Sequence, residues 1–268
     1  MNRRRLVLAV LALLTVGGVG AYIARDSDDP TDDLRAVGAA TTSSSAPDTT
    51  TVTTPPSTLG SSTSATPTSA PASTTIAPAP PFESSVESVT AAQLGSSWHP
   101  NMGCAEPAEL RLVAVTRWGY DGEVHQGRLV VAAAQADRIV AAFRDIYAAR
   151  FPIERMEPID AYGGDDQASM AGNNTSAFNC RTVAGSARLS EHAYGRAIDV
   201  NPLRNPYVRA DGQVDPLSGA PFADRSRTDP GIIHEGDAAV AAFAAQGWQW
   251  GGHWSAGKDY QHFSTSGR

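Results

Sequence analysis

Two stretches in the C-terminal half of the chain hold the side chains best suited to metal chemistry. One contains His192 and Asp199, and the other contains Asp259 and His262. Two imidazoles and one carboxylate, with one coordination position left open, form a catalytic zinc set. His192, Asp199 and His262 are therefore candidate ligands of one zinc ion. Asp259 lies three residues before His262, a spacing that shares one side of a turn or helix, so Asp259 is a candidate for handling the proton of a metal-bound water.

The elements around these residues are expected to turn them toward one another. Residues 197–200 read as a strand, in which neighbouring side chains face opposite sides. This alternation sends the aliphatic side chains into one layer and Asp199, together with the small Ala197, to the other face. Gly195 permits the turn that brings His192 back over that face.

The remaining pattern predicts an α+β fold. We expect strands at 112–118 and 128–132, helices at 134–150 and 237–246, a short extended piece between Pro152 and Pro158, a loop at 163–166 and a long surface excursion at 205–229. Strands and helices do not alternate regularly, which argues against a doubly wound sheet. The expected architecture is one compact domain in which a small antiparallel sheet carries the zinc site and helices flank it.

Composition divides the 268 residues into two parts, because nearly all residues that can build a core or do chemistry lie in the C-terminal part. From Thr41 to Pro80, Thr, Ser, Pro and Ala supply 35 of 40 residues, a composition that cannot bury a core and predicts a disordered stalk. All Trp, Phe, His and Cys residues lie at or beyond Phe82. We therefore expect a linker at 25–81 and one well-buried domain at 82–268.

The N-terminus has the pattern of an export signal. Arg3, Arg4 and Arg5 precede an apolar run that extends from Leu6 to about Ile23. The run is long for a cleaved signal, which favours an uncleaved anchor at 1–24, with a cleavage site after Ala21 as the alternative. Basic residues stay cytoplasmic, so the domain is expected outside the cell membrane, either on a single-pass anchor or secreted.

Charge and cysteines narrow the setting. The net charge is −7 and no long basic run follows the N-terminal arginines, which argues against nucleic acid as a partner. Cys104 and Cys180 are the only cysteines. An exported protein meets oxidising conditions, so we expect a disulfide between them, with two unpaired thiols as the alternative.

The motifs also carry a resemblance. The pattern Ser-x-His-x-x-Gly-x-Ala-x-Asp at 190–199, followed by Asp-x-x-His at 259–262, resembles the zinc peptidases that cut the stem peptides of bacterial peptidoglycan. That family includes the VanY-type D-alanyl-D-alanine carboxypeptidases and the L-alanyl-D-glutamate endopeptidases of phage lysins. The segments 173–181, 201–207 and 125–127 are similar to this family as well, so the resemblance covers about residues 100 to 265.

The resemblance implies roles for named residues. One zinc ion per domain would be held by His192, Asp199 and His262, with Asp259 as the general base and Arg181 facing the scissile carbonyl. Five further residues are expected around the substrate, either in contact with it or packed behind the ligands: Ser190, Tyr194, His253, Trp254 and, lining the cleft, His125. The implied partners are peptidoglycan stem peptides, and we expect a monomer.

Two other classes of function remain open from the residues. The domain could be a wall-binding module that keeps zinc only for stability. It could also be a cysteine hydrolase that uses Cys180 and His192, although such an enzyme would leave Asp259 without a role. The choice of peptide bond is open too: an Asp in the base position is more typical of the endopeptidase branch, whereas the domain as a whole resembles the VanY type.

Overall fold

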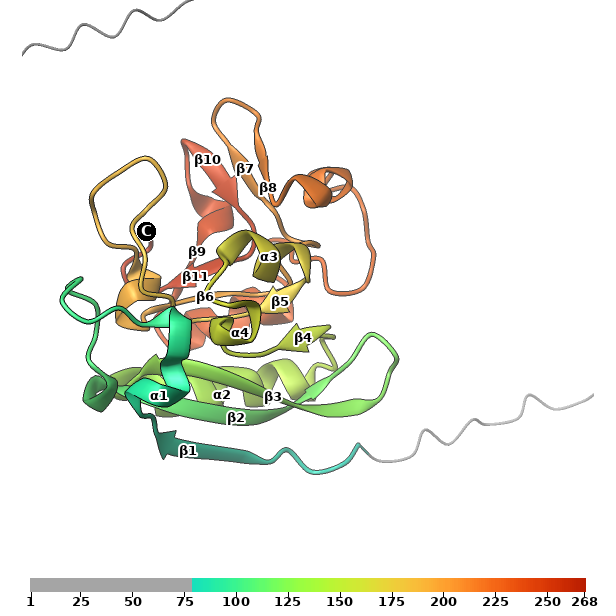
Figure 1. Cartoon of the computed structure of the whole chain (residues 1–268). Coiled ribbons are helices and arrows are strands. Elements are labelled where there is room, and N and C mark those ends of the chain that lie inside the picture. Colours follow the sequence, from blue (N-terminus) through green and yellow to red (C-terminus); the bar gives the residue numbers. More distant parts are fainter. Residues whose placement is uncertain (1–78) are drawn as a thin grey trace, which may run out of the picture. The chain divides into compact units, whose positions relative to one another are not determined.

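The computed structural model describes residues 79–268 (Figure 1). The expected signal or anchor segment 1–24 and all but the last three residues of the expected linker therefore lie outside the described residues. Within the described part of the chain, no helix combines the length and apolar character needed to cross a membrane.

The first layer is an antiparallel sheet of three strands in the order β1-β2-β3. Its strands are β1 (Ser84–Ser88), β2 (Leu110–Trp118) and β3 (Val124–Ala132). The two longer strands bury side chains on both faces, with Val113 and Leu129 on one side and Leu110 and Val130 on the other, as the two-residue period of a strand requires.

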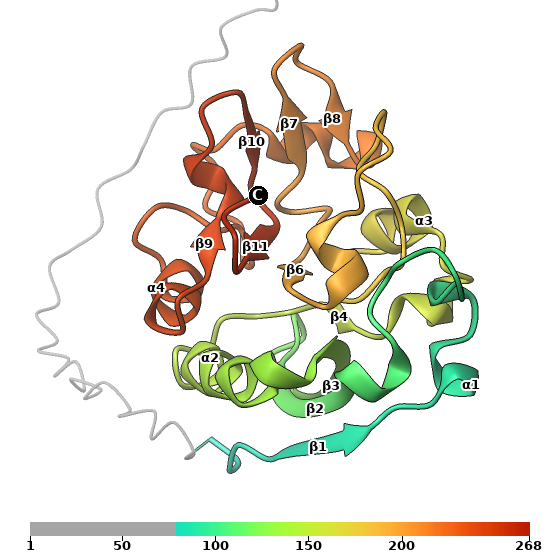
Figure 2. The same cartoon turned by 90° about the vertical axis from the view of Figure 1, so that its left-hand side faces the viewer.

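Three expected elements of this layer differ from the structure in their bounds. The strand expected at 112–118 begins two residues earlier, at Leu110. The strand expected at 128–132 begins at Val124, so the segment 125–127 belongs to the strand instead of preceding it. The helix expected at 134–150 is α2 (Ala136–Ala148), because residues 133–135 form a 3-10 turn. Helix α2 packs against β2 and α4 (Figures 1 and 2).

A second antiparallel sheet has the order β6-β11-β9. It consists of β6 (Ala197–Asp199), β11 (His262–Ser264) and β9 (Gln249–Trp250). Helix α4 (Ala238–Ala245) packs against β9 and ends before Gly247, which has φ +80. The left-handed conformation favours glycine and explains the stop signal at this position. Short antiparallel sheets flanked by helices confirm the expected α+β class.

The smaller elements complete the domain. Helices α1 (Ala91–Leu94) and α3 (Asp166–Ala171) are short, strands β4 (Arg155–Met156) and β5 (Asn174–Thr175) pair in parallel, and β10 (Gly257–Asp259), β7 (Tyr207–Arg209) and β8 (Val214–Asp215) form a third antiparallel sheet. The expectation of a mere surface excursion at 205–229 is therefore wrong for β7 and β8, because β7 pairs with β10 and β8 pairs with β7.

Two apolar clusters hold the domain together. The larger lies between the first sheet, α2, α4 and the second sheet, and it includes Phe143 and Phe243, whose ring centroids are 5.8 Å apart. The smaller lies on the other face of the first sheet and includes Phe178 and the disulfide. Each cluster supports one side of the site described below.

Candidate metal centre and cleft

The pairing of β6 with β11 sets two of the predicted ligands opposite each other. In this antiparallel register Asp199 faces His262, and the next pair, Ile198 and Phe263, faces the larger apolar cluster. Directly opposed side chains of an antiparallel pair lie on the same face of the sheet. The predicted alternation along residues 197–200 is confirmed, because Ile198 and Val200 are both in the core.

The third ligand, His192, comes from a 3-10 helix, Glu191–Tyr194, whose two ends are fixed by neighbouring residues. At its start, the Ser190 hydroxyl accepts a hydrogen bond from the backbone N–H of His192. At its end, Gly195 adopts φ +64, and a Cβ there would lie 2.4 Å from the backbone nitrogen of Ala132. Only glycine fits this close approach, so Gly195 returns His192 over the sheet as the sequence predicted.

The three predicted ligands converge. His192 Nε2 lies 3.2 Å from Asp199 Oδ2, His262 Nδ1 lies 3.0 Å from Asp199 Oδ1, and the two ring nitrogens are 3.3 Å apart. All three residues are buried, at 3 to 6% exposure, and their ligand atoms lie within 4.8 Å of one another. Two imidazole nitrogens and a carboxylate oxygen aimed at one point match the donor set of a zinc site.

Main-chain carbonyls orient both imidazoles from behind. The other nitrogen of His192, Nδ1, lies 2.6 Å from the carbonyl oxygen of Ala177, and His262 Nε2 lies 3.0 Å from that of Arg268. A carbonyl can only accept, so each of these ring nitrogens carries the proton. The nitrogens that face Asp199 are then free to donate a lone pair to a cation, which is the usual arrangement around metal-binding histidines.

The charges of Asp199 and the two histidines depend on one another. Burial alone would raise the pKa of the Asp199 carboxyl, but the adjacent His192 and His262 rings hold it well below its usual range. Burial opposes a charge on His262, yet the hydrogen bond and the charge of Asp199 raise its pKa. The site therefore keeps a negative Asp199 that attracts positive charge, as a cation site requires.

Asp259, the predicted base, sits at the end of β10 beside this group. Burial raises the pKa of its carboxyl to about 7, against the lowering effects of His262 and Arg181. Its Oδ1 is buried and has no hydrogen-bond partner among residues 79–268. This oxygen lies next to three side chains that could bind a cation. It is therefore free to accept a hydrogen bond from a water or ligand held at that site.

Arg181 reaches the site from a segment without regular secondary structure. Phe178 and Cys180 point into the smaller apolar cluster, while the Ala177 carbonyl accepts from His192. The backbone N–H of Phe178 donates to the Val130 carbonyl on the free edge of β3. Segment 177–181 is therefore docked on an edge strand, and Arg181 at its end lines the cleft.

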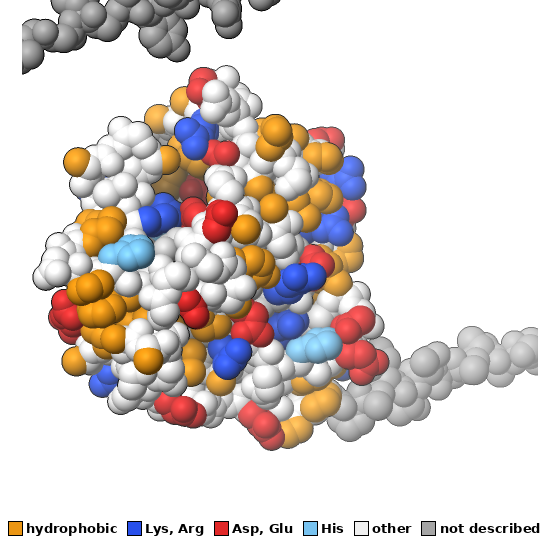
Figure 3. Space-filling model, in the orientation of Figure 1, with side chains coloured by type: hydrophobic (Ala, Val, Ile, Leu, Met, Phe, Trp, Pro, Cys, Tyr) orange, Lys and Arg blue, Asp and Glu red, His pale blue; other side chains and the backbone are white. Residues whose placement is uncertain are grey.

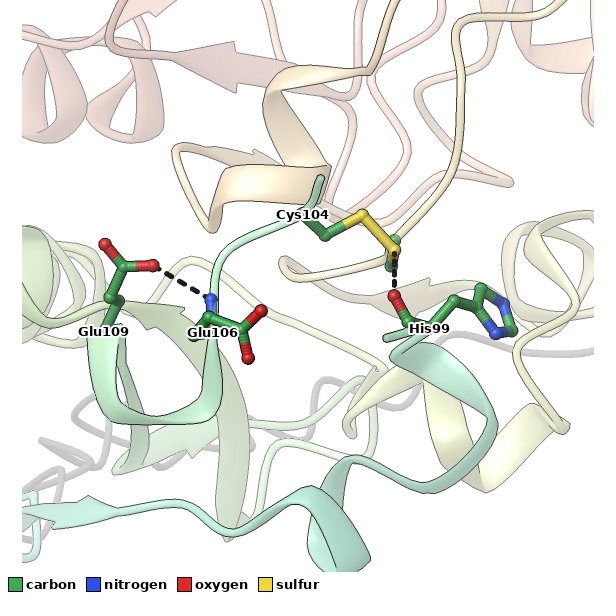
Figure 4. Close-up of a disulfide and its surroundings, with 5 residues drawn as sticks. His99, Cys104, Glu106 and Glu109 are labelled. Carbon is green, nitrogen blue, oxygen red and sulfur yellow. Dashed lines mark hydrogen bonds between the residues drawn. A yellow bond between two sulfur atoms is a disulfide. The ribbon is translucent and has the colours of Figure 1, made fainter. Parts of the chain in front are cut away.

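The expected disulfide is present next to Arg181. Cys104 and Cys180 are joined across a sequence separation of 76 residues (Figure 4). The Cys180 backbone N–H also donates to the Ser97 carbonyl at 2.9 Å. The residue that precedes Arg181 is thus held both covalently and by a hydrogen bond.

The candidate site lies in one cleft of about 720 Å³. Figure 3 shows a hollow on this face of the molecule, at the place where Figure 1 draws the loop around residue 185 opposite β7 and β10. The cleft lining includes the three ligands, Asp259, Arg181 and two of the expected substrate-site residues, Ser190 and Trp254. The Trp254 ring lies 5.4 Å from the His262 ring, centroid to centroid.

Three expected substrate-site residues, Tyr194, His253 and His125, are not among those that line the cleft, and their roles stay predictions. His125 pairs with Asp121 on the β2–β3 hairpin at 2.9 Å. His253 is exposed and pairs with Glu235, and the guanidinium of Arg196 covers the ring of Tyr194. In each case a local partner holds the side chain.

Sequence reasoning missed several residues of the cleft wall. Tyr207, Arg209 and Asp215 come from the β7–β8 hairpin, and Asp166 comes from the start of α3. The 163–166 segment was interpreted only as a loop, although Asp165 and Asp166 directly precede and begin a helix. Acidic residues at a helix start were the available signal.

Comparisons with known proteins agree with this geometry. Residues 184–265 match the family model described as D-alanyl-D-alanine carboxypeptidase. The matched segment contains all three predicted ligands and Asp259 but not Arg181. It confirms the resemblance and supports a carboxypeptidase-like peptidase. Searches among curated proteins and among solved structures found no match.

Proposed function

We propose that this protein is a zinc-dependent peptidase that hydrolyses peptide bonds in the stem peptides of bacterial peptidoglycan. One observation carries the proposal: three buried ligand atoms converge on one point of a cleft, next to a buried carboxylate oxygen that has no partner among the described residues. A metal kept only for stability would need no such carboxylate and no access from a cleft.

The chain's own residues divide the work of hydrolysis. His192, Asp199 and His262 would hold the zinc, which when bound supplies a Lewis acid that activates water and polarises a carbonyl. Asp259 accepts the proton of the attacking water and later delivers it to the leaving amine. Arg181 donates hydrogen bonds to the carbonyl oxygen, on which negative charge develops in the transition state.

The two other classes of function fare differently. Cys180 is bonded to Cys104 and has no free thiol, which removes the nucleophile of a cysteine hydrolase. A wall-binding module remains a testable competitor. Its cleft would bind muropeptides without cutting them.

We further propose that the domain works outside the cell membrane as a monomer. The apolar segment after Arg5 and the Thr/Ser/Pro/Ala tract support a tether that carries the domain toward the wall. Accessibility of the domain to protease added to intact, wall-stripped cells measures this, and protection of the domain would contradict it.

The function is tested by incubating purified muropeptides with the oxidised full-length protein. We expect about one zinc per chain, measured by elemental mass spectrometry, and a new peptide product in the muropeptide mass spectrum. Loss of a terminal alanine identifies a carboxypeptidase, and release of the stem from the sugar-linked alanine identifies an endopeptidase. Binding of muropeptides by zinc-loaded protein without any product would instead identify a wall-binding module.

The matched variant is Asp259→Ala. It should keep its zinc and lose roughly 10²- to 10⁴-fold in kcat, the usual range for a general base. Asp137→Ala on the exposed face of α2 is the control and should behave as wild type. Full activity of Asp259→Ala would show that the assigned base is wrong.

A further inference from the structure

Among residues 79–268, the Arg181 side chain has one close side-chain partner. Its Nη2 lies 3.1 Å from Asp166 Oδ2. The Arg181 side chain is 30% exposed and the Asp166 side chain 28%. The only other hydrogen bond of the guanidinium within residues 79–268 is a long one of 3.5 Å, from Nη1 to the Thr182 carbonyl. Its Nε is buried and has no partner in the same part of the chain.

Asp166 is itself held from two sides. It begins α3, whose preceding residue, Asp165, caps the helix by accepting from the Ala168 N–H. Its second carboxylate oxygen accepts a hydrogen bond of 3.2 Å from the Asn179 side chain. Asn179 is buried, and its backbone N–H donates to the carbonyl of His192. Asp166 therefore joins α3 to both Arg181 and the backbone of a metal ligand.

We propose that Asp166 is a positioning residue that holds the Arg181 guanidinium in the cleft, an assignment that rests on the proposed function. A free arginine side chain has about 2 kcal/mol of rotamer entropy, and Arg181 enters the cleft from an irregular segment. A carboxylate fixed by Asn179 removes that freedom before substrate binds. It occupies Nη2 and leaves Nε and part of Nη1 available to donate to a developing oxyanion.

The geometry predicts that Asp166 acts only through Arg181. It would then not touch the reacting atoms, and its removal would weaken transition-state stabilisation and leave the metal ligands in place. Loss of kcat with little change in KM is the signature of an interaction made in the transition state. A residue that merely stabilises α3 would lower thermal stability without this kinetic pattern.

A double-mutant cycle in the full-length oxidised protein tests the assignment, with muropeptide cleavage, zinc content and melting temperature as readouts. We expect Asp166→Ala to lower kcat about 10- to 100-fold and Arg181→Ala to lower it about 10²- to 10³-fold, both with one zinc retained. The double variant should match Arg181→Ala alone. Asp166→Asn, which keeps an acceptor but loses the charge, should fall between wild type and Asp166→Ala.

Asp165→Ala is the matched control, because it removes the cap of the same helix but no contact to Arg181. It should lower the melting temperature and leave kcat unchanged. Equal kinetic losses in Asp165→Ala and Asp166→Ala would overturn the proposal, as would losses that multiply in the double variant. A crystal structure of Asp166→Ala with Arg181 in its original place would also overturn it.

Failure of wild-type protein to cleave would instead refute the proposed function. An impaired Arg181→Ala variant beside a fully active Asp166→Ala variant would refute only this assignment.

Discussion

The cleft has two sides that are built by different means. On one side Asp199 and His262 face each other across the β6–β11 pair, and their strands have the larger apolar cluster behind them. On the other side Arg181 and His192 come from segments without long strands. These segments are attached to the free edge of β3 through the Val130 carbonyl and the Ala132 N–H, and to Cys104 through the disulfide.

The difference separates two tasks. Strand pairing holds side chains to a register that cannot slip without turning every residue over, which suits a metal site. The loop-built side depends on a few individual features, namely Gly195, the Cys104–Cys180 disulfide and the Asp166 carboxylate. We infer that the strand-built side holds two of the three metal ligands in register, and that the loop-built side adds the third ligand, His192, and the aim of Arg181.

The largest expected effect lies on the strand-built side. His262→Ala removes one of two ligands held by strand pairing, while the backbone pairing of β11 stays. We expect a folded protein by circular dichroism with little zinc and no detectable cleavage, because three ligands are needed to retain the ion. His253→Ala, an exposed histidine outside the cleft, should retain about one zinc. Stoichiometric zinc in His262→Ala would break the comparison.

An intermediate effect is expected on the loop-built side. Replacing both cysteines (Cys104→Ser with Cys180→Ser) opens a loop with a sequence separation of 76 residues and should lower the free energy of unfolding by roughly 4 to 5 kcal/mol in the chain-entropy model. Urea denaturation measures this loss. Per folded molecule, cleavage should fall more than zinc content. Reductant should affect wild type in the same way and the variant not at all. A fall in zinc content that matches the fall in cleavage would show that the two sides are not separable.

The smallest expected effect concerns Asp259 and pH. Its pKa is raised from 3.8 to about 7 in the folded domain, so the folded state binds this proton more tightly than the unfolded state. The resulting stability is present below pH 4 and is lost as the pH rises through about 7. With EDTA present, wild type should lose on the order of 4 kcal/mol more than Asp259→Asn over this range. Parallel urea-denaturation curves for the two proteins across pH 4 to 8 would contradict the burial of this carboxylate.

Local chemistry made much of the site predictable. Two histidines and an aspartate with the right spacing, a strand whose aliphatic residues alternate with Asp199, and a glycine where the chain must turn are all visible in the residues themselves. The disulfide followed from the number of cysteines and the predicted export. Such features depend on residue type and short spacing, which a sequence shows directly.

The missed parts depend on contacts between distant segments. Strands β7 and β8 are only two or three residues long. They exist because β10, far along the chain, pairs with β7, while their Pro-, Gly- and Asp-rich surroundings indicate a loop. The proposed role of Asp166 depends on its contact with Arg181, and His125 pairs with Asp121. Strand propensity and spacing carry no information about such partners.

Gly195 has a consequence for reading related sequences. The position tolerates no side chain, since a Cβ would meet the backbone of β3. A relative that keeps both histidines and the aspartate but carries another residue here must move its His192 equivalent away from the other two ligands. Such a protein would keep the ligand motif in its sequence but would not bind the metal. Glycine at this position is therefore a simple filter for separating active members from degenerate copies when genomes are screened for this motif.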